Sequence, residues 1–255
     1  ALSAGLGEGE SVAFTAIITD TASQSTTGTA SGTTIAVDQT APTIFYVTST
    51  TNDGSYKADV SLPILVFCSE NLTVDTTAGT PTLTLETGVS DADVNYTSVS
   101  ASALKFVYTV SAGHNSSDLD YKSNSALSLN SGLISDAAGN TLVLTLADPA
   151  ESNSLSSSKD LVIDTTAPII SEVTPISTPT TDNTPSYVFT TNETGTLTTG
   201  INSFTPTSIS STGNNTVTFS TLSDGTYNSE TIVLTDAAGN NSNTLSVTTF
   251  IVDTT

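Results

Sequence analysis

Residues 60–68 read Val60-Ser61-Leu62-Pro63-Ile64-Leu65-Val66-Phe67-Cys68, with an apolar side chain at every second position from Val60 to Cys68. Alternate side chains of a strand point to opposite faces, so this run predicts a β-strand with one buried face. Residues 104–110 alternate in the same way, and residues 216–219 and 231–235 are shorter runs of the same kind. No segment carries a convincing helical period. We therefore expect an all-β chain with almost no helix.

Turn-forming residues separate these runs at intervals of about 8–12 residues, the spacing of short strands in a sandwich or barrel. Examples are Asn52-Asp53-Gly54, Ala138-Gly139-Asn140 and Asp224-Gly225. Tyr227 follows Asp224-Gly225 at the start of a strand, which resembles a tyrosine corner, a packing device of β-sandwiches. The pattern predicts β-sandwich domains.

The composition excludes several classes of function. The 255 residues carry 25 acidic and four basic side chains, all lysines, for a formal net charge of −21. Four scattered lysines cannot neutralise a phosphate backbone, so we expect no nucleic-acid partner. No stretch reaches the about 20 apolar residues of a membrane span. We expect no membrane span in these residues.

The sequence offers little for catalysis. Cys68 alternates with apolar positions and is expected to be a buried, inert thiol. His114 lies in a predicted loop and is expected to be a solvated side chain. Asp75-Thr76-Thr77-Ala78-Gly79 is superficially similar to the Asp-Thr-Gly of aspartic proteases, but the second carboxylate that such enzymes need has no visible motif. We expect the protein not to be an enzyme.

Two short elements recur in a fixed order. Asp-Ala-Ala-Gly-Asn occurs at residues 136–140 and 236–240, with a degenerate copy at residues 20–24. Each copy is followed by a strand-like run and then by an Asp-x-Thr element that begins at Asp38, Asp164 or Asp253. These three aspartates lie 126 and 89 residues apart. Both spacings suit a β-sandwich of about 100 residues.

The repeats divide the chain into three parts. Residues 38–164 form a long sandwich repeat and residues 165–255 a short one. Residues 1–37 hold two strand-like runs, about Ser11–Thr19 and Thr33–Val37, that match the last strands of the following units. An isolated hairpin is marginally stable in water. We therefore expect residues 1–37 to be the C-terminal strands of a truncated repeat, in a window on a longer repetitive protein.

These elements resemble the bacterial immunoglobulin-like repeats of giant secreted and surface adhesins. The resemblance extends over residues 10–255 and is carried by the Asp-Ala-Ala-Gly-Asn and Asp-x-Thr-Ala-Pro elements. It implies tandem immunoglobulin-like, Greek-key β-sandwiches in a cadherin-like rod, with Ca²⁺ at or near the junctions. It also implies an extracellular or cell-surface location in bacteria.

The strand order of such a sandwich brings the acidic elements together. The F–G loop (Asp136 to Asn140), the B–C loop (Glu70) and the entering chain (Asp38) then share one pole. Because converging carboxylates without a cation repel, an ion that accepts 6–8 oxygen ligands would stabilise them. The ligand candidates are Asp38, Glu70, Asp136 and Asn140 at the first junction, Asp164, Glu193, Asp236 and Asn240 at the second, and Asp20 and Asp253 at junctions that this window truncates.

A simpler explanation of the same motifs is turn formation alone, with Asp and Asn side chains bonding their own backbone. Pro42 and Pro168 fix φ where each next sandwich begins and stiffen the linker in either case.

The function expected first is a structural extender of a large secreted or surface protein. Its partners are then neighbouring repeats of the same chain, possible further copies in a fibre, and surface glycans bound through another part of the protein. One alternative is a subunit of a polymeric filament or coat joined by strand or linker exchange. Another is a carbohydrate- or ligand-binding adhesin module, for which Tyr46, Tyr56 and Tyr96 are the available aromatic side chains.

Overall fold

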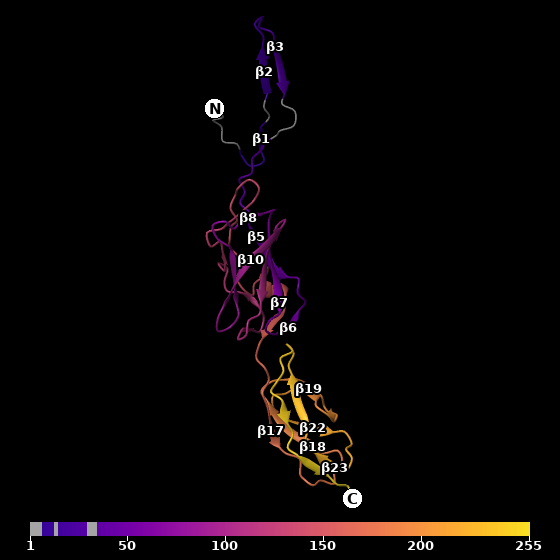
Figure 1. The fold of residues 1–255 in the computed structure, drawn as a ribbon. Helices are drawn as coiled ribbons and strands as arrows, with labels where there is room; N and C mark the ends of the chain where they lie inside the picture. Colours follow the sequence, from indigo (N-terminus) through magenta and orange to yellow (C-terminus); the bar gives the residue numbers. More distant parts are fainter. Residues whose placement is uncertain (1–6, 13–14, 30–34) are drawn as a thin grey trace.

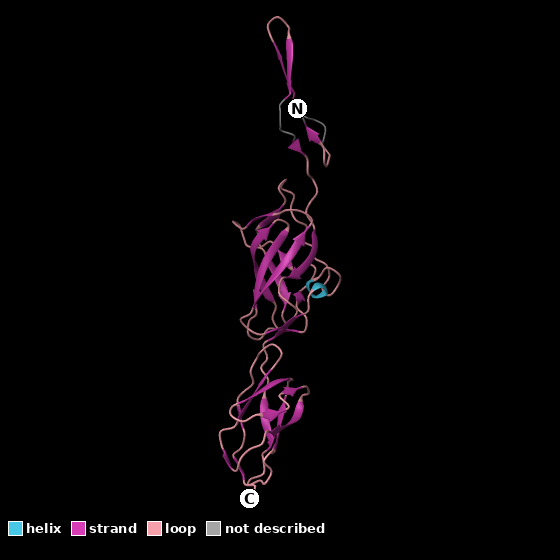
Figure 2. Ribbon diagram, turned by 90° about the vertical axis from the view of Figure 1, so that its right-hand side faces the viewer, coloured by secondary structure: helices cyan, strands magenta, loops and turns pink. Residues whose placement is uncertain are grey.

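A computed structural model describes residues 7–12, 15–29 and 35–255. The described parts lie end to end, with two strand pairs at the N-terminal end followed by two β-sandwiches (Figure 1). Nearly all regular structure is β, and the only helix among these residues is the four-residue α1 (Leu155–Ser158) (Figure 2). The predicted all-β fold with almost no helix is confirmed.

The second sandwich consists of two four-stranded sheets and a short edge pair. One sheet has the order β17-β18-β22-β20 and the other β21-β19-β24-β25. With β17 as strand A, these are the orders A-B-E-D and C′-C-F-G of an immunoglobulin-like sandwich. The strands are β17 (Ile170–Thr174), β18 (Ser186–Thr191), β19 (Gly195–Thr199), β20 (Phe204–Thr205), β21 (Ser208–Ile209), β22 (Gly213–Phe219), β24 (Thr231–Thr235) and β25 (Leu245–Ser246), with β23 (Gly225–Tyr227) paired to β26 (Phe250–Val252).

The first sandwich repeats this plan with a larger sheet. Its seven-stranded sheet follows the path β13-β9-β10-β11-β7-β5, with β14 also paired to β9, and two small sheets complete the domain. The large sheet contains β5 (Ile44–Ser49), β7 (Ser61–Cys68), β9 (Thr82–Glu86), β10 (Ala92–Ser100), β11 (Ala103–Thr109), β13 (Asp120–Tyr121) and β14 (Leu127–Ser128); the small ones are β12 (Asn115–Ser116) with β16 (Leu161–Asp164) and β6 (Gly54–Tyr56), and β8 (Thr73–Asp75) with β15 (Leu133–Ser135).

Each sandwich has its own apolar core. In β7 the alternation is complete, because Leu62, Ile64 and Val66 are fully buried while the residues between them face outward. Cys68 ends this buried face, and burial raises the pKa of its thiol to about 12. The second core is built around aromatic side chains that include Tyr187, Phe189 and Phe250. The buried clusters of the two sandwiches share no residue.

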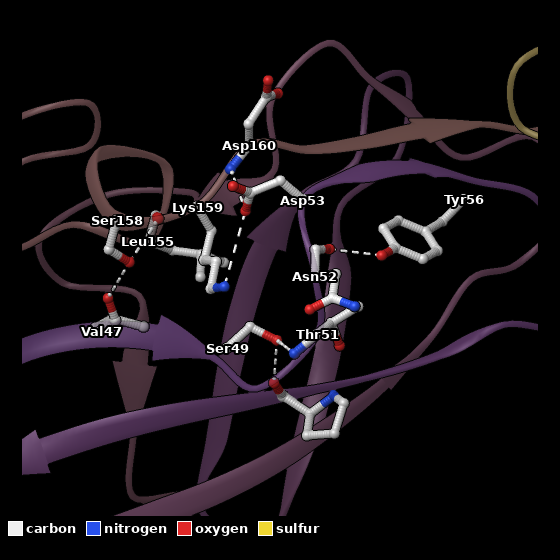
Figure 3. Close-up of polar contacts among 11 residues, drawn as sticks. Val47, Ser49, Thr51, Asn52, Asp53, Tyr56, Leu155, Ser158, Lys159 and Asp160 are labelled. Carbon is white, nitrogen blue, oxygen red and sulfur yellow. Dashed lines mark hydrogen bonds and ion pairs between the residues drawn. The ribbon is translucent and has the colours of Figure 1, made fainter.

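Each sandwich has a tyrosine whose hydroxyl bonds to the backbone four residues upstream, and Tyr227 is the one that stands between strands E and F, where a tyrosine corner occurs. The hydroxyl of Tyr227 donates to the carbonyl of Ser223 at 2.8 Å, as the sequence predicted. The hydroxyl of Tyr56 donates in the same way to the carbonyl of Asn52 at 2.5 Å (Figure 3). Both tyrosines follow an Asp-Gly-x sequence, so the hydrogen bond of Tyr56 could have been predicted by analogy with that of Tyr227.

The N-terminal residues form strands without a sandwich around them. β1 (Ser11–Val12) pairs with β4 (Ile35–Ala36), and β2 (Thr15–Thr19) forms a hairpin with β3 (Ser25–Thr29). Residues 13–14 and 33–34 of the two predicted runs lie outside the described residues. Ile17 and Ile18 are 66% and 75% exposed. Thr15–Thr19 matches Thr231–Thr235 in sequence, and Leu234, the counterpart of Ile18, is fully buried.

Candidate metal centres at the domain junctions

Three carboxylates meet where the N-terminal strands enter the first sandwich. Asp38 follows β4, Glu70 lies in the connection between β7 and β8, and Asp136 directly follows β15. One carboxylate oxygen of each residue lies within 4.8 Å of the others. The strands place Glu70 in the B–C loop and Asp136 in the F–G loop, as the sequence argument required.

The second junction repeats the arrangement, and its linker aspartate, Asp164, lies 126 residues after Asp38. Asp164 ends β16, Glu193 connects β18 to β19, and Asp236 follows β24. Their carboxylate oxygens also lie within 4.8 Å of one another. Among the described residues, these two clusters are the groups of acidic side chains close enough to hold a metal ion.

The Asp-Ala-Ala-Gly-Asn loops have one backbone conformation. In the first loop, Oδ1 of Asp136 accepts the backbone N–H of Gly139 at 2.7 Å and that of Asn140 at 2.8 Å. In the second, Oδ1 of Asp236 accepts the N–H of Asn240 at 2.9 Å. Gly139 and Gly239 adopt φ values of 95° and 89°, a region that favours glycine. The motif therefore fixes the position of its aspartate within the cluster.

The asparagines of these loops tie the linker to the sandwich. The side-chain Nδ2 of Asn140 donates to Oδ2 of Asp136 at 2.8 Å and to the backbone carbonyl of Asp38 at 3.2 Å. Asn240 makes the same two bonds, to Asp236 and to the carbonyl of Asp164. The Nδ2 groups of both asparagines thus bridge cluster residues and position them, and direct ligation of a cation through Oδ1 stays a prediction.

The linker aspartates form turns as well as clusters. Oδ1 of Asp38 accepts the N–H of Thr40 at 3.1 Å, and Oδ1 of Asp164 accepts that of Thr166 at 2.9 Å. Both explanations offered for the Asp-x-Thr element are therefore compatible in one geometry. The turn uses one carboxylate oxygen, Oδ1, of each aspartate.

Electrostatic repulsion acts on the glutamate of each cluster. Partial desolvation, together with the charges of Asp38, Asp136 and Glu8, raises the pKa of Glu70 above its usual value. Desolvation and the charges of Asp164 and Asp236 raise the pKa of Glu193 likewise.

Asp136 shows the opposite balance. Burial raises its pKa, but the hydrogen bonds from Asn140 and from the loop backbone outweigh burial and hold the pKa below the usual range. The pKa values of Asp136 and Glu70 are therefore shifted in opposite directions within one cluster.

None of the ion pairs among the described residues neutralises these clusters. Lys122 pairs with Glu86 and Asp91, and Lys159 lies 3.8 Å from Asp53 (Figure 3). The donor set consists of hard carboxylate oxygens, and five of the six residues are partly exposed. This chemistry fits Ca²⁺, which takes oxygen ligands in flexible geometry. Asp38, Glu70 and Asp136, and equally Asp164, Glu193 and Asp236, are the residues that would hold it.

Two further predicted ligands have no cluster around them in the described part of the chain. Oδ1 of Asp20 accepts the N–H groups of Ala22 and Gln24, and Ser23 at φ 65° stands where the other loops have glycine. Asp253 makes the same turn with Thr255 that Asp38 makes with Thr40. Both residues thus keep the local motif conformation without a second or third carboxylate nearby.

The sequence did not reveal a contact that we call the linker clamp, in which a side chain accepts the backbone N–H of the residue that follows a junction aspartate. Oε2 of Glu8 accepts the N–H of Gln39 at 2.6 Å, and Oδ1 of Asp224 accepts that of Thr254 at 3.0 Å. Each acceptor precedes a glycine and contacts the residue after a junction aspartate. The shared acid-Gly pair was the available signal. At the second junction Asn115 takes this place, with Oδ1 2.9 Å from the N of Thr165.

The other side chains singled out from sequence have structural surroundings. Tyr46 stacks on Phe67 with ring centroids 4.7 Å apart, and Tyr96 meets the edge of Phe106 at 6.2 Å. His114 is half-buried rather than simply solvated, with Nδ1 2.9 Å from the Tyr108 hydroxyl. These contacts gather no aromatic side chains around a common hollow.

Fold and site together describe tandem all-β sandwiches with a carboxylate cluster at each of two junctions. No family model matches the chain, and neither the curated proteins nor the solved structures include a significant match to it. Within the described residues, no helix has the length and apolar character needed to cross a bilayer. The carboxylate clusters at the two junctions are therefore the features that bear on function.

Proposed function

We propose that this chain is a spacer segment of a large secreted or cell-surface protein, in which Ca²⁺ bound at the inter-domain junctions sets the stiffness of a rod. The observation that carries the proposal is the repeated convergence of three carboxylates from three separate elements at each junction. The end-to-end order of the units supports an extending role (Figure 1). The resemblance of the repeat motifs to bacterial immunoglobulin-like adhesin repeats is further support.

The expected affinity makes calcium a structural ligand. Extracellular calcium modules bind at about 10⁻⁴–10⁻³ M. At 10 mM calcium each site is then at about 10–100 Kd and stabilises the folded state by roughly 1.4–2.7 kcal/mol. Domains of this size are stable by about 5–15 kcal/mol, so each ion supplies a sizeable share.

Isothermal titration of the chelator-treated chain with Ca²⁺ tests the proposal. We expect two sites with dissociation constants of about 10⁻⁴–10⁻³ M. The double variant Glu70→Gln/Glu193→Gln, which removes one carboxylate from each cluster, should weaken both sites. Glu151→Gln, outside the clusters, is the matched control and should bind like the unchanged chain. Titration heats no larger than dilution would contradict the calcium role.

One observation favours a second function, a subunit of a polymeric filament. The exposed Ile17 and Ile18 lie on β2, whose second edge is open within the described residues. In the second sandwich the matching strand β24 pairs on that edge with β19. A chain that exchanged strands at β2 would sediment as oligomers, and Ile18→Asp would return it to the monomer. Sedimentation as a monomer at all concentrations would reject the filament.

A further inference from the structure

The two junctions share a plan but differ in the contacts that hold them. At both, the asparagine of the F–G loop reaches across to the carbonyl of the linker aspartate, at 3.2 Å for Asn140 and 3.0 Å for Asn240. At both, a side chain accepts the N–H of the next linker residue, 39 or 165. The junctions differ in the charge of that acceptor and in whether a lysine contacts the F–G loop.

The second linker is bound to the first sandwich by neutral groups. Oδ1 of Asn115 accepts the N–H of Thr165 at 2.9 Å, and the Thr165 hydroxyl donates to the carbonyl of His114 at 3.1 Å. The N–H of Gly113 donates to the same hydroxyl at 2.9 Å. Asn115 also pairs with Asp164 between strands β12 and β16. The linker therefore continues the first sandwich as far as Thr165.

A lysine of the first sandwich then holds the second one. Lys57 follows β6, at the end of the first sandwich that faces the second (Figure 1). Its Nζ donates to the carbonyl of Gly239 at 2.9 Å, within the loop that carries Asp236. This is a direct contact between the two sandwiches, 182 residues apart in sequence. It also places a positive charge beside the loop of the second carboxylate cluster.

The first junction differs in the charge of the acceptor that binds its linker and, among the described residues, in having no lysine contact. Its linker clamp is the charged side chain of Glu8, whose Oε2 accepts the N–H of Gln39, the residue that follows Asp38, at 2.6 Å. The position equivalent to Gly239 is Gly139, and a side chain built there would meet no described atom within 4 Å. The first junction thus has the carboxylate of Glu8 in addition to the three clustered carboxylates, and no lysine contact among the described residues. The second has three carboxylates, a neutral clamp and Lys57.

We propose that Lys57 and Asn115 make the second junction a fixed joint with or without a bound cation, whereas Glu8 makes the first junction a joint that stiffens only when a cation offsets its carboxylates. The fixed joint rests on hydrogen bonds and stands independently of metal binding. The behaviour of the first joint rests on the calcium role proposed above. In such a rod, loss of calcium bends the chain near residues 38–40 and leaves residues 164–166 straight.

Pulsed electron spin resonance on the full chain can test the two joints separately. In a Cys68→Ala background, spin labels at Ser98→Cys and Thr198→Cys report the second junction, and labels at Ser11→Cys and Ser98→Cys report the first. We expect the distance distribution across the second junction to have the same width in EDTA as in calcium. The first should widen at least twofold. Equal widening of both would overturn the proposal.

Variants that change the charge at each junction identify the residues that set its stiffness. Glu8→Gln keeps an acceptor oxygen and removes the charge, so it should narrow the first distribution in EDTA. Lys57→Ala/Asn115→Asp removes the lysine and adds a charge, so it should widen the second. Lys105→Ala, on the sheet of the first sandwich, is the control and should change neither. Circular dichroism and a thermal melt establish that each variant is folded, and an unchanged first distribution in Glu8→Gln overturns the role of Glu8.

The calcium titration separates this inference from the proposed function. Calcium binding with equal widening of both joints in EDTA would retain the proposed function and reject the fixed joint. The opposite result is a chain that binds no calcium but has a narrow distance distribution across the second junction, which widens in Lys57→Ala/Asn115→Asp. That result would retain the fixed joint and reject the calcium-dependent first joint.

Discussion

Single aspartates at the junctions take part in two structures at once. Asp38 closes a turn with Thr40 through one oxygen and lies in a carboxylate cluster with Glu70 and Asp136. Asp253 closes the same turn with Thr255 and has no cluster around it in the described residues. The Asp-x-Thr motif therefore predicts the turn from local sequence. The cluster depends on residues about 30 and 100 positions away, which the motif alone does not specify.

Glu70→Gln should separate repulsion from calcium binding. Without calcium, removing the charge relieves repulsion from Asp38 and Asp136, so the melting temperature of the variant in EDTA should equal or exceed that of the unchanged chain. With calcium, the variant should lose most of the stabilisation from the first site, which amounts to a few degrees. Thermal melts in both buffers measure this. A calcium-induced shift as large as that of the unchanged chain would show that Glu70 is not a ligand.

The same residue predicts a pH dependence with a definite sign. Because the folded-state pKa of Glu70 is raised above its unfolded value, its contribution to stability is fully present below the unfolded pKa and is lost as pH rises through the folded pKa. In EDTA, the difference in melting temperature between Glu70→Gln and the unchanged chain should be small near pH 4 and should grow toward pH 7. A difference that shrinks as pH rises would mean that Glu70 is stabilised as an anion.

Among the elements, strands with a buried face were the ones predictable from sequence. The runs at residues 60–68, 104–110 and 231–235 became β7, β11 and β24, because alternation records which face meets the core. The two-residue strands β13 and β14 carry too few residues to show a period. Helix α1 has the sequence Leu-Ser-Ser-Ser and is held by Asp120, which accepts the N–H of Leu155 at 3.2 Å and the hydroxyl of Ser156 at 2.6 Å. That contact joins residues 35 positions apart, and the local signal for the helix is limited to Ser154, the N-cap residue whose side chain accepts the N–H of Ser157.

Tyr227→Phe tests the corner that fastens β23. The substitution removes the hydrogen bond to the carbonyl of Ser223 and keeps the ring, which stacks on Phe250 at 5.1 Å. We expect a loss of about 0.5–1.5 kcal/mol in the free energy of unfolding, measured by urea denaturation. Tyr56→Phe is the matched change in the first sandwich. A loss above about 3 kcal/mol would mean that the ring packing had also changed.

At the scale of the whole molecule, the repeat spacing predicts a change of unit at Asp164, and the two buried clusters occupy residues 47–163 and 170–252. The contact between Lys57 and Gly239 could not be predicted, because it depends on how two complete sandwiches meet. The Glu8 clamp depends on the same tertiary geometry at the first junction. These contacts belong to the assembled chain rather than to any one repeat.

Separate cores predict separate unfolding. Phe189→Ala removes a fully buried ring from the second core and should cost about 3–5 kcal/mol there. Differential scanning calorimetry should show one lowered transition and one near its original temperature. Phe106→Ala, in the first core, should reverse which transition moves. A single transition lowered equally by both variants would indicate one cooperative unit.

Small-angle X-ray scattering of the full chain, first in 10 mM calcium and then in EDTA, is the most direct measurement of calcium-dependent stiffness. We predict an extended particle in calcium whose maximum dimension shortens, or whose distance distribution broadens, when the ion is removed. Glu151→Gln should behave like the unchanged chain in both buffers, and Glu70→Gln/Glu193→Gln should differ less between calcium and EDTA than the unchanged chain does. Identical scattering curves in calcium and EDTA, with an unchanged melting temperature, would contradict the calcium-stiffened rod and leave the junction aspartates as turn residues.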